Sequence, residues 1–361
     1  MASTEKSNKS YLDLVNECDK PLSTLHTTWA EHRESTHSFA RASAHSSKLR
    51  SRGFPYPQTA PGLYDATLDG LYTLLVAEEE SILGFVLPRV AEVLRGLPSW
   101  TLNDEDRTLT LSAGPTEEER SAIVAATTMA MRQTGHFQVL SGWRDELYPV
   151  YGRDGRCLFK IERSASPLFG VVSYGVHMIC YKKDATTGEY SFWTPKRAMT
   201  KQTYPGMLDN TVAGGLAAGE KPLEAVVREG EEEASLPAEL VRETAKVVGN
   251  VSYFLVRDEK AGGETGLMQP ESQYVYDMEL PDDVVPKPND SEVESFALLS
   301  TEEVKVSLRR GEFKPNCGLV MLDFFIRHGI LTPENEPDYV EIIARLHRKF
   351  EFPTVKCPGS Q

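Results

Sequence analysis

Residues 213–236 read "AGGLAAGEKPLEAVVREGEEEASL" and place four glutamates within five positions, directly after Arg228. Pro222 suits the first turn of a helix. A helix over 222–234 would gather its apolar side chains on one face, namely Leu223, Val226, Val227, Gly230 and Ala234. The same period would stack three carboxylates on a second face, namely Glu229, Glu232 and Glu233.

The helical period alone allows two interpretations of this acidic face. It can be a solvated surface of an acidic protein, or it can hold a divalent cation. Like charges at this spacing cost about 0.2–0.5 kcal/mol per pair, and Gly230 costs about 1 kcal/mol relative to alanine. A cation such as Mg²⁺ would offset the repulsion, since it prefers carboxylate oxygens. A close approach of a neighbouring backbone would explain Gly230.

The spacing around this helix resembles the signature of the Nudix hydrolases, G-x5-E-x7-R-E-U-x-E-E-x-G-U, where U is a bulky apolar residue. The matching residues are Gly214, Glu220, Arg228, Glu229, Glu232, Glu233 and Leu236. Two positions depart, because Gly230 replaces a bulky apolar residue and Ser235 replaces a glycine. The departure at Ser235 leaves the geometry of the helix exit open.

The resemblance implies an α/β fold, a Nudix α/β/α sandwich with a mixed sheet. It implies that the helix binds Mg²⁺ (or Mn²⁺) through Glu229, Glu232 and Glu233. The backbone at Ala213 or Gly214 would complete the metal's ligands. The expected protein is therefore an enzyme, and most of its expected catalytic residues lie on this one helix.

The remaining catalytic roles also follow from the resemblance. Arg228 would orient the carboxylates and could also pair with Glu224, and Glu220 would brace the loop. The implied reaction is metal-assisted hydrolysis of a diphosphate bond by an activated water. In "NDSEVESF", Glu292 and Glu294 are the two candidates for the base, and Glu292 is also a candidate metal ligand. Solvation of an acidic loop is the alternative for both.

The stretch before the helix supplies candidate substrate contacts. Lys196, Arg197 and Lys201 are cations that could donate to a diphosphate, or they could simply end a strand at a polar surface. The aromatic residues that could stack on a substrate ring are Trp193, Tyr204 and Trp143. Each of these three is also a reasonable core residue.

The flanks "FWTPKRAMTKQTYPGMLDNTVAGGL" and "GWRDELYPVYG" narrow the resemblance. They are similar to a fungal and plant subgroup with a thiamine-pyrophosphokinase-related N-terminal domain. This similarity implies hydrolysis of thiamine diphosphate, or of its oxidised or damaged forms (oxo- and oxythiamine diphosphate), to the monophosphate, a metabolite-repair role. The alternatives are a hydrolase of ADP-ribose or another nucleoside diphosphate derivative, and a non-catalytic ligand-binding protein of this fold. The intact glutamates count against the last.

Composition excludes several other classes. The formal net charge of −14 argues against binding to nucleic acid or to an anionic membrane. The five cysteines are scattered, and no C-x-x-C occurs, so a disulfide scaffold or a zinc site is not expected. No apolar run reaches the roughly 18 residues of a membrane helix. A small-molecule diphosphate is the expected partner, and the cytoplasm the expected location.

The chain divides into two expected domains. We expect a disordered tail at 1–10, an N-terminal α+β domain at 11–165, a Nudix domain with C-terminal helices at 166–350 and a tail at 351–361. Within the first domain, the sequence predicts a strand at 107–112 and a helix at 116–134 that opens on a Thr116–Glu119 capping box. Residues 83–94 look helical, with Pro88 interrupting the pattern.

Overall fold

A computed structural model describes residues 8–19 and 70–355 of the chain. These residues form two compact units. The α8 unit, named after the helix in the acidic segment, contains residues 8–19, 174–253 and 271–348. The N-terminal unit contains residues 70–173, 254–270 and 349–355. None of the helices in these ranges combines the length and apolar character that crossing a membrane requires.

The α8 unit is built on a six-stranded sheet in the order β10-β11-β7-β8-β12, with β9 paired to β7. Its strands are β7 (Ser173–Lys183), β8 (Tyr190–Arg197), β9 (Val212–Gly215), β10 (Lys246–Val256), β11 (Met268–Glu279) and β12 (Val293–Ser300). Its helices are α1 (Tyr11–Cys18), α8 (Pro222–Ala234), α9 (Ala238–Thr244), α10 (Thr301–Arg309), α11 (Pro315–Arg327) and α12 (Tyr339–Leu346).

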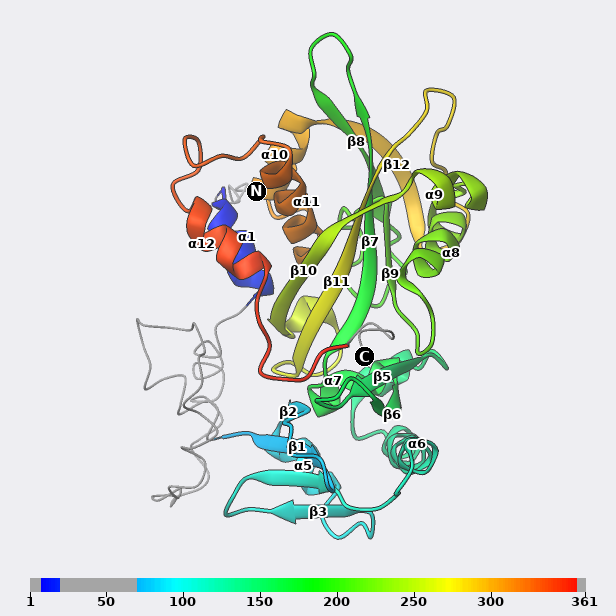
Figure 1. Ribbon diagram of the computed structural model, residues 1–361, viewed down its shortest axis with the longest axis vertical. Coiled ribbons are helices and arrows are strands. Elements are labelled where there is room, and N and C mark those ends of the chain that lie inside the picture. The colour runs from blue at the N-terminus through cyan, green and yellow to red at the C-terminus, as the bar shows by residue number, and fades with distance from the viewer. Residues whose placement is uncertain (1–7, 20–69, 356–361) are drawn as a thin grey trace, which may run out of the picture. The chain divides into compact units, whose positions relative to one another are not determined.

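Helices cover both faces of this sheet. Helices α8 and α9 lie on one face, and α10, α11, α12 and α1 lie on the other (Figure 1). Alternate residues of β7 explain the layering: Val176, Met178 and Cys180 are fully buried in the core cluster that α8 packs against. The expected α/β/α sandwich of the Nudix fold is therefore confirmed for this unit.

The pairing of β7 with β9 positions the start of the acidic segment. The two strands are antiparallel, with Val176 opposite Gly214 and His177 opposite Ala213. Helix α8 packs directly on β9. The glycines that begin the acidic segment are therefore held in the sheet, next to the helix that carries the glutamates.

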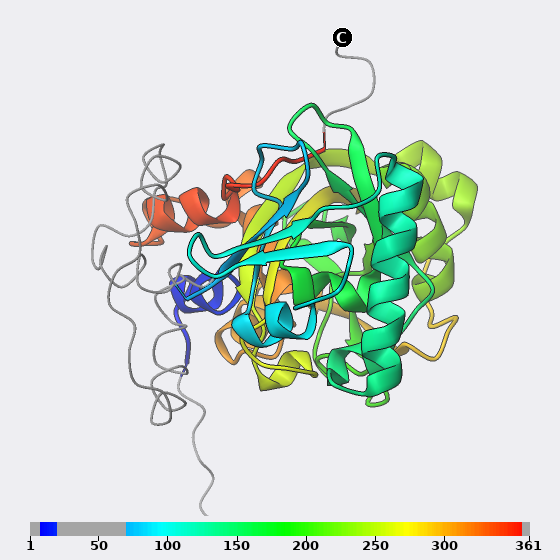
Figure 2. The same ribbon diagram turned by 90° about the horizontal axis from the view of Figure 1, so that it is seen from below.

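The N-terminal unit contains a four-stranded sheet in the order β2-β1-β4-β3 and a separate β5–β6 hairpin. Its strands are β1 (Tyr72–Val76), β2 (Gly84–Val86), β3 (Trp100–Asn103), β4 (Thr108–Leu111), β5 (Leu147–Tyr151) and β6 (Cys157–Glu162). Its helices are α5 (Pro88–Val93), α6 (Glu117–Thr134), α7 (Ser166–Phe169) and the short 3₁₀ turns η3 (Gln138–Gly142), η4 (Arg163–Ala165) and η5 (Glu259–Ala261). Figure 2 shows α6 as the long helix of this unit.

Most sequence-based elements of the N-terminal unit are confirmed, with one clear error. Helix α6 begins with the expected capping box, in which Thr116 and Glu119 bond reciprocally. The helix expected over 83–94 is wrong in its first half, which forms strand β2. Pro88 does not interrupt a helix but begins one, because proline is tolerated where no backbone N–H partner is needed.

The boundary between the units differs from the expected position. It falls between residues 173 and 174 instead of near 165, since α7 and its neighbours pack with the N-terminal unit. Helix α1, expected in the first domain, belongs to the α8 unit and packs on α10, α11 and α12. Of the expected tails, residues 1–7 and 356–361 lie outside the described residues.

Candidate active site

Helix α8 has the bounds that the sequence predicts, Pro222–Ala234. It ends at Ser235, which adopts a left-handed conformation with φ 54°. The backbone N–H of Leu236 donates to the carbonyl of Gly230 at 3.0 Å, and the Ser235 hydroxyl donates to the carbonyl of Lys287 at 3.0 Å. The serine therefore takes the backbone conformation usually given to glycine, and its side chain supplies an additional contact.

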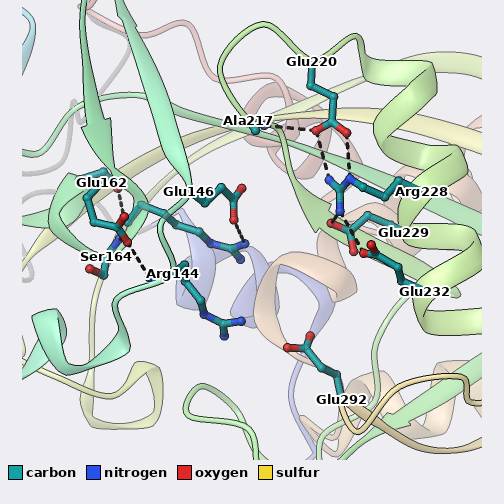
Figure 3. A network of polar contacts seen from close by, with 12 residues as sticks. Arg144, Glu146, Glu162, Ser164, Ala217, Glu220, Arg228, Glu229, Glu232 and Glu292 are labelled. Atoms are coloured by element: carbon teal, nitrogen blue, oxygen red, sulfur yellow. Dashed lines mark hydrogen bonds and ion pairs between the residues drawn. The ribbon is translucent and has the colours of Figure 1, made fainter. Parts of the chain in front are cut away.

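Arg228 connects the loop before α8 to the acidic face of the helix (Figure 3). Its Nε and Nη2 donate to the two carboxylate oxygens of Glu220 at 2.9 and 3.1 Å. Its Nη1 donates to Glu229 at 2.8 Å and to Glu232 at 3.1 Å. The expected pair between Arg228 and Glu224 is wrong, because Glu224 pairs with Arg242 on α9 instead.

Glu233 faces the interior, although the helical period placed it on one face with Glu229 and Glu232. Its side chain is only 8% exposed, and one of its oxygens accepts the backbone N–H of Ala213 at 3.0 Å. Burial, followed by the charges of Glu229 and Asp209, raises the pKa of Glu233 well above its ordinary value. The backbone N–H of Ala213 and the charge of Lys201 act in the opposite direction.

Gly214 lies against the carboxylate of Glu229. A Cβ atom built at position 214 would stand 2.1 Å from the Glu229 carboxyl carbon, so no larger residue fits without moving that carboxylate. The absence of a side chain at 214 therefore allows Glu229 to lie between α8 and β9. The sequence indicated this glycine only through its place in the signature.

The residues of this site fit a divalent cation. Carboxylate oxygens are the ligands that Mg²⁺ and Mn²⁺ prefer, and Glu233 is buried with like charges beside it. A bound cation would offset that repulsion and the loss of solvation. Within residues 8–19 and 70–355, no three acidic, histidine or cysteine side chains already converge into a ligand cluster. The signature implies Glu229, Glu232 and Glu233 as the residues that would hold the cation.

The two distal glutamates are each paired with a lysine, one near the end of β8 and one in the loop that follows it. Glu294, at the start of β12, accepts from Lys196 at 2.9 Å, and both side chains are about half exposed. Glu292, one residue before β12, pairs with Lys201, whose side chain is 13% exposed. The structure therefore brings the predicted base, the predicted metal ligand and two of the predicted phosphate donors together as two ion pairs.

Arg197 is buried, unlike the two lysines. Its Nη1 donates to Asp209 at 2.6 Å, and its other nitrogens donate to the carbonyls of Thr203 and Tyr204 at 2.9 and 3.2 Å. Asp209 also lies close enough to Glu233 to raise the pKa of that carboxyl. Sequence reasoning missed Asp209, which carries no motif; its position just before strand β9 was the only signal.

The aromatic residues predicted to stack on a substrate ring mostly pack against other parts of the protein. Trp193 packs against the core cluster beneath α8, and Tyr204 is 5% exposed. Trp143 lies in the N-terminal unit, where the Arg132 guanidinium stacks 4.9 Å from its ring centroid. His177 on β7 is buried, and its Nδ1 lies 2.7 Å from Asn210 Oδ1. Burial lowers the pKa of His177 to about 4, so the ring is neutral.

The N-terminal unit has a polar network of its own around Glu162, which ends β6 (Figure 3). The Glu162 carboxylate is 3% exposed and accepts the backbone N–H groups of Arg144 and Ser164 at 2.9 and 3.3 Å. Arg163 pairs with Glu146 at 2.8 Å. These contacts join the start of β5 to the end of β6, at the end of the hairpin opposite its turn.

Comparisons with known proteins agree with this architecture. A family model described as "NUDIX domain" matches residues 174–317, and one described as "Domain of unknown function (DUF4743)" matches residues 67–173. The chain is 44% identical over 220 residues to "Uncharacterized protein YJR142W" of Saccharomyces cerevisiae, covering 60% of this chain and 64% of that protein. The match therefore spans slightly less than two thirds of the yeast protein.

Two relatives from Arabidopsis thaliana are covered more fully. The chain is 36% identical to "Nudix hydrolase 20, chloroplastic", over 75% of this chain and 72% of that one. It is 35% identical to "Nudix hydrolase 24, chloroplastic", over 74% and 71%. The chain therefore belongs to the Nudix hydrolase family, a pyrophosphatase class of enzymes, and carries a DUF4743 domain before its Nudix domain.

Gly230 offers a test of local packing. The expected close approach of a neighbouring backbone is wrong, since a Cβ at 230 would meet Val241 at 3.6 Å and Leu236 at 3.9 Å, ordinary contact distances. We expect Gly230→Ala to raise the free energy of unfolding by about 1 kcal/mol, because glycine is unfavourable inside a helix. Urea unfolding measures this change. Gly214→Ala, which would displace Glu229, is the control and should bring no gain in the free energy of unfolding. A Gly230→Ala variant less stable than the wild type would contradict the conclusion that position 230 has room for a Cβ.

Proposed function

We propose that this protein is a Mg²⁺-dependent pyrophosphatase that hydrolyses thiamine diphosphate, or its oxo- and oxythiamine forms, to the monophosphate. The observation that carries the proposal is the grouping of three glutamates on one helix: Arg228, itself bound to Glu220, donates to Glu229 and Glu232, and the buried Glu233 accepts from the Ala213 N–H. The thiamine-type substrate rests on the flanking sequences "FWTPKRAMTKQTYPGMLDNTVAGGL" and "GWRDELYPVYG", which are similar to the thiamine-related subgroup.

The chemistry adds water across the phosphoric anhydride. The P–O–P bond breaks, the water oxygen stays on one phosphorus atom, and a proton leaves that water. A bound divalent cation would polarise the phosphate oxygens and lower the pKa of a water. Glu294 is the proposed base, with Glu292 a further metal ligand. The proposed cationic residues that face the diphosphate are Lys196 and Lys201. Arg197 contributes indirectly, because its buried guanidinium holds the backbone of the loop that carries Lys201.

Substrate choice is tested by a panel. Phosphate release from thiamine, oxothiamine and oxythiamine diphosphates would be compared with release of phosphate or nucleotide from ADP-ribose and nucleoside diphosphates. We expect the thiamine-type compounds to give the highest kcat/KM, with the oxidised forms preferred, and the monophosphate as product. A higher kcat/KM for ADP-ribose would move the substrate to the nucleotide class. No turnover of any compound, despite ligand binding, would indicate a non-catalytic protein.

The proposed role is the removal of damaged cofactor in the cytoplasm. An oxidised or damaged thiamine diphosphate still resembles the intact cofactor, so it would compete with that cofactor for binding to the enzymes that use it. Hydrolysis to the monophosphate would remove the diphosphate group on which such competition depends.

A further inference from the structure

We propose that Lys201 and Glu292 form an exchangeable ion pair: a diphosphate takes the ammonium of Lys201 as a divalent cation takes the carboxylate of Glu292. This inference rests on the proposed function, since it concerns the same cation and the same diphosphate. It goes further in one respect. The cation and the diphosphate would each have to break the same Lys201–Glu292 contact, so the binding of one should favour the binding of the other.

The pair joins two segments that are 91 residues apart in the chain. The Lys201 ammonium binds a carboxylate oxygen of Glu292, and the backbone N–H of Ala198 donates to the Glu292 carbonyl at 2.9 Å. Lys201 is 13% exposed and Glu292 34% exposed. A lysine with so little exposure to solvent is stabilised in its charged form by anionic neighbours, and Glu292 is such a neighbour here.

The same ammonium also acts on the acidic helix. Lys201 and Glu233 interact electrostatically, each favouring the charged form of the other. One internal cation therefore faces two of the carboxylates proposed to hold the metal. A divalent cation placed among those carboxylates would repel the ammonium, which must then find another anion.

Arg197 keeps the backbone of the loop in place. Its guanidinium holds the carbonyls of Thr203 and Tyr204 and is itself fixed by Asp209. The loop carrying Lys201 is thus fixed at Thr203 and Tyr204, two and three residues beyond the lysine. The exchange requires only that the Lys201 side chain rotate, and its four-carbon stem allows this.

The exchange leaves every charge with a partner. Before it, Lys201 neutralises Glu292; after it, Lys201 neutralises a phosphate oxygen, and the divalent cation neutralises Glu292. No covalent bond changes. A cation that binds Glu292 frees Lys201 for the diphosphate, and a diphosphate that binds Lys201 frees Glu292 for the cation. The cation should therefore raise the affinity for the diphosphate, and the diphosphate must raise the affinity for the cation by the same factor.

Calorimetric titration of the full chain with Mn²⁺ alone provides the first test. We expect Lys201→Met to bind Mn²⁺ roughly tenfold more tightly than the wild type, because a competing charge is gone. The gain should vanish in the Lys201→Met/Glu292→Gln double variant. Lys182→Met is the matched control, because Lys182 also pairs with a carboxylate, that of Asp282, at 2.9 Å. Lys182 lies on β7 six residues beyond Val176, which is the residue opposite Gly214, so its backbone is roughly 20 Å from that of Val176.

The second test uses methylenediphosphonate, a non-hydrolysable diphosphate, with Mn²⁺ in excess. Lys201→Met should weaken its binding by roughly tenfold, and Lys201→Arg, which keeps the charge, by less. Opposite effects on the cation and on the diphosphonate are the signature of exchange. An unchanged or lower Mn²⁺ affinity in Lys201→Met, a gain that persists in the double variant, or unaltered diphosphonate binding would each overturn the proposal. None of these measurements uses turnover, so an error in the thiamine-type substrate would leave their outcome unaffected.

Discussion

Glu233→Gln is expected to lower turnover of a diphosphate substrate by about a thousandfold while the protein stays folded. The substitution keeps the shape of the side chain and its acceptor for the Ala213 N–H, but glutamine cannot supply the carboxylate that a cation would bind. A metal site supplies several kcal/mol of transition-state stabilisation, and a loss of about 4 kcal/mol corresponds to about a thousandfold in rate. Steady-state phosphate release measures the effect.

The same variant should be at least as stable as the wild type. Glu233 is buried beside the charges of Glu229 and Asp209, and glutamine relieves that repulsion. Loss of activity together with an unchanged or higher Tm separates a catalytic role from a folding defect. Glu231→Gln is the matched control, because Glu231 lies on the same helix with its side chain exposed. Equal losses in both variants, or none in either, would contradict the assignment of Glu233.

Asp19→Asn is expected to destabilise the α8 unit by about 3–5 kcal/mol. Asp19 is fully buried and pairs with Arg345 at 3.2 Å and with Arg348 at 2.7 Å. Both arginines are also buried, at 3% and 5% exposure. Removing the carboxylate charge leaves two guanidinium groups without their shared counter-ion, and a broken buried ion pair costs about this much.

Urea unfolding followed by circular dichroism measures this loss. Hydrogen exchange in peptides from 11–19 and 339–346 would show whether α1 and α12 loosen first. Asp282→Asn is the control, since Asp282 is fully exposed while it pairs with Lys182, and such a surface pair contributes at most about 1 kcal/mol. A change of similar size in both variants would show that the Asp19 cluster does not hold these helices together.

Local sequence signals predicted the elements of the acidic segment well. Pro222 and the apolar spacing set the bounds of α8, and the capping box at Thr116 set the start of α6. The error over 83–94 has the same origin: Pro88 is compatible with both the interior of a pattern and its beginning. Strand β2 before it is only three residues long and carries no alternation to detect.

Contacts between distant segments could not be read from the sequence. The helical period placed Glu233 with Glu229 and Glu232, but its burial depends on β9 packing beside the helix. Helical spacing made Glu224 a possible partner of Arg228, but the loop before the helix brings Glu220 to Arg228, and Glu224 pairs with Arg242 instead. The Lys201–Glu292 pair depends on how the loop after β8 meets the segment before β12.

The central claim is that α8 holds a divalent cation against the phosphates of a substrate. Calorimetry with Mn²⁺ and methylenediphosphonate, comparing the wild type with a Glu229→Gln/Glu233→Gln double variant, tests it most directly. We expect the wild type to bind Mn²⁺ and the double variant to lose at least about tenfold in affinity while remaining folded. Equal Mn²⁺ affinity in the two proteins, or no Mn²⁺ binding by the wild type with the diphosphonate present, would contradict the account.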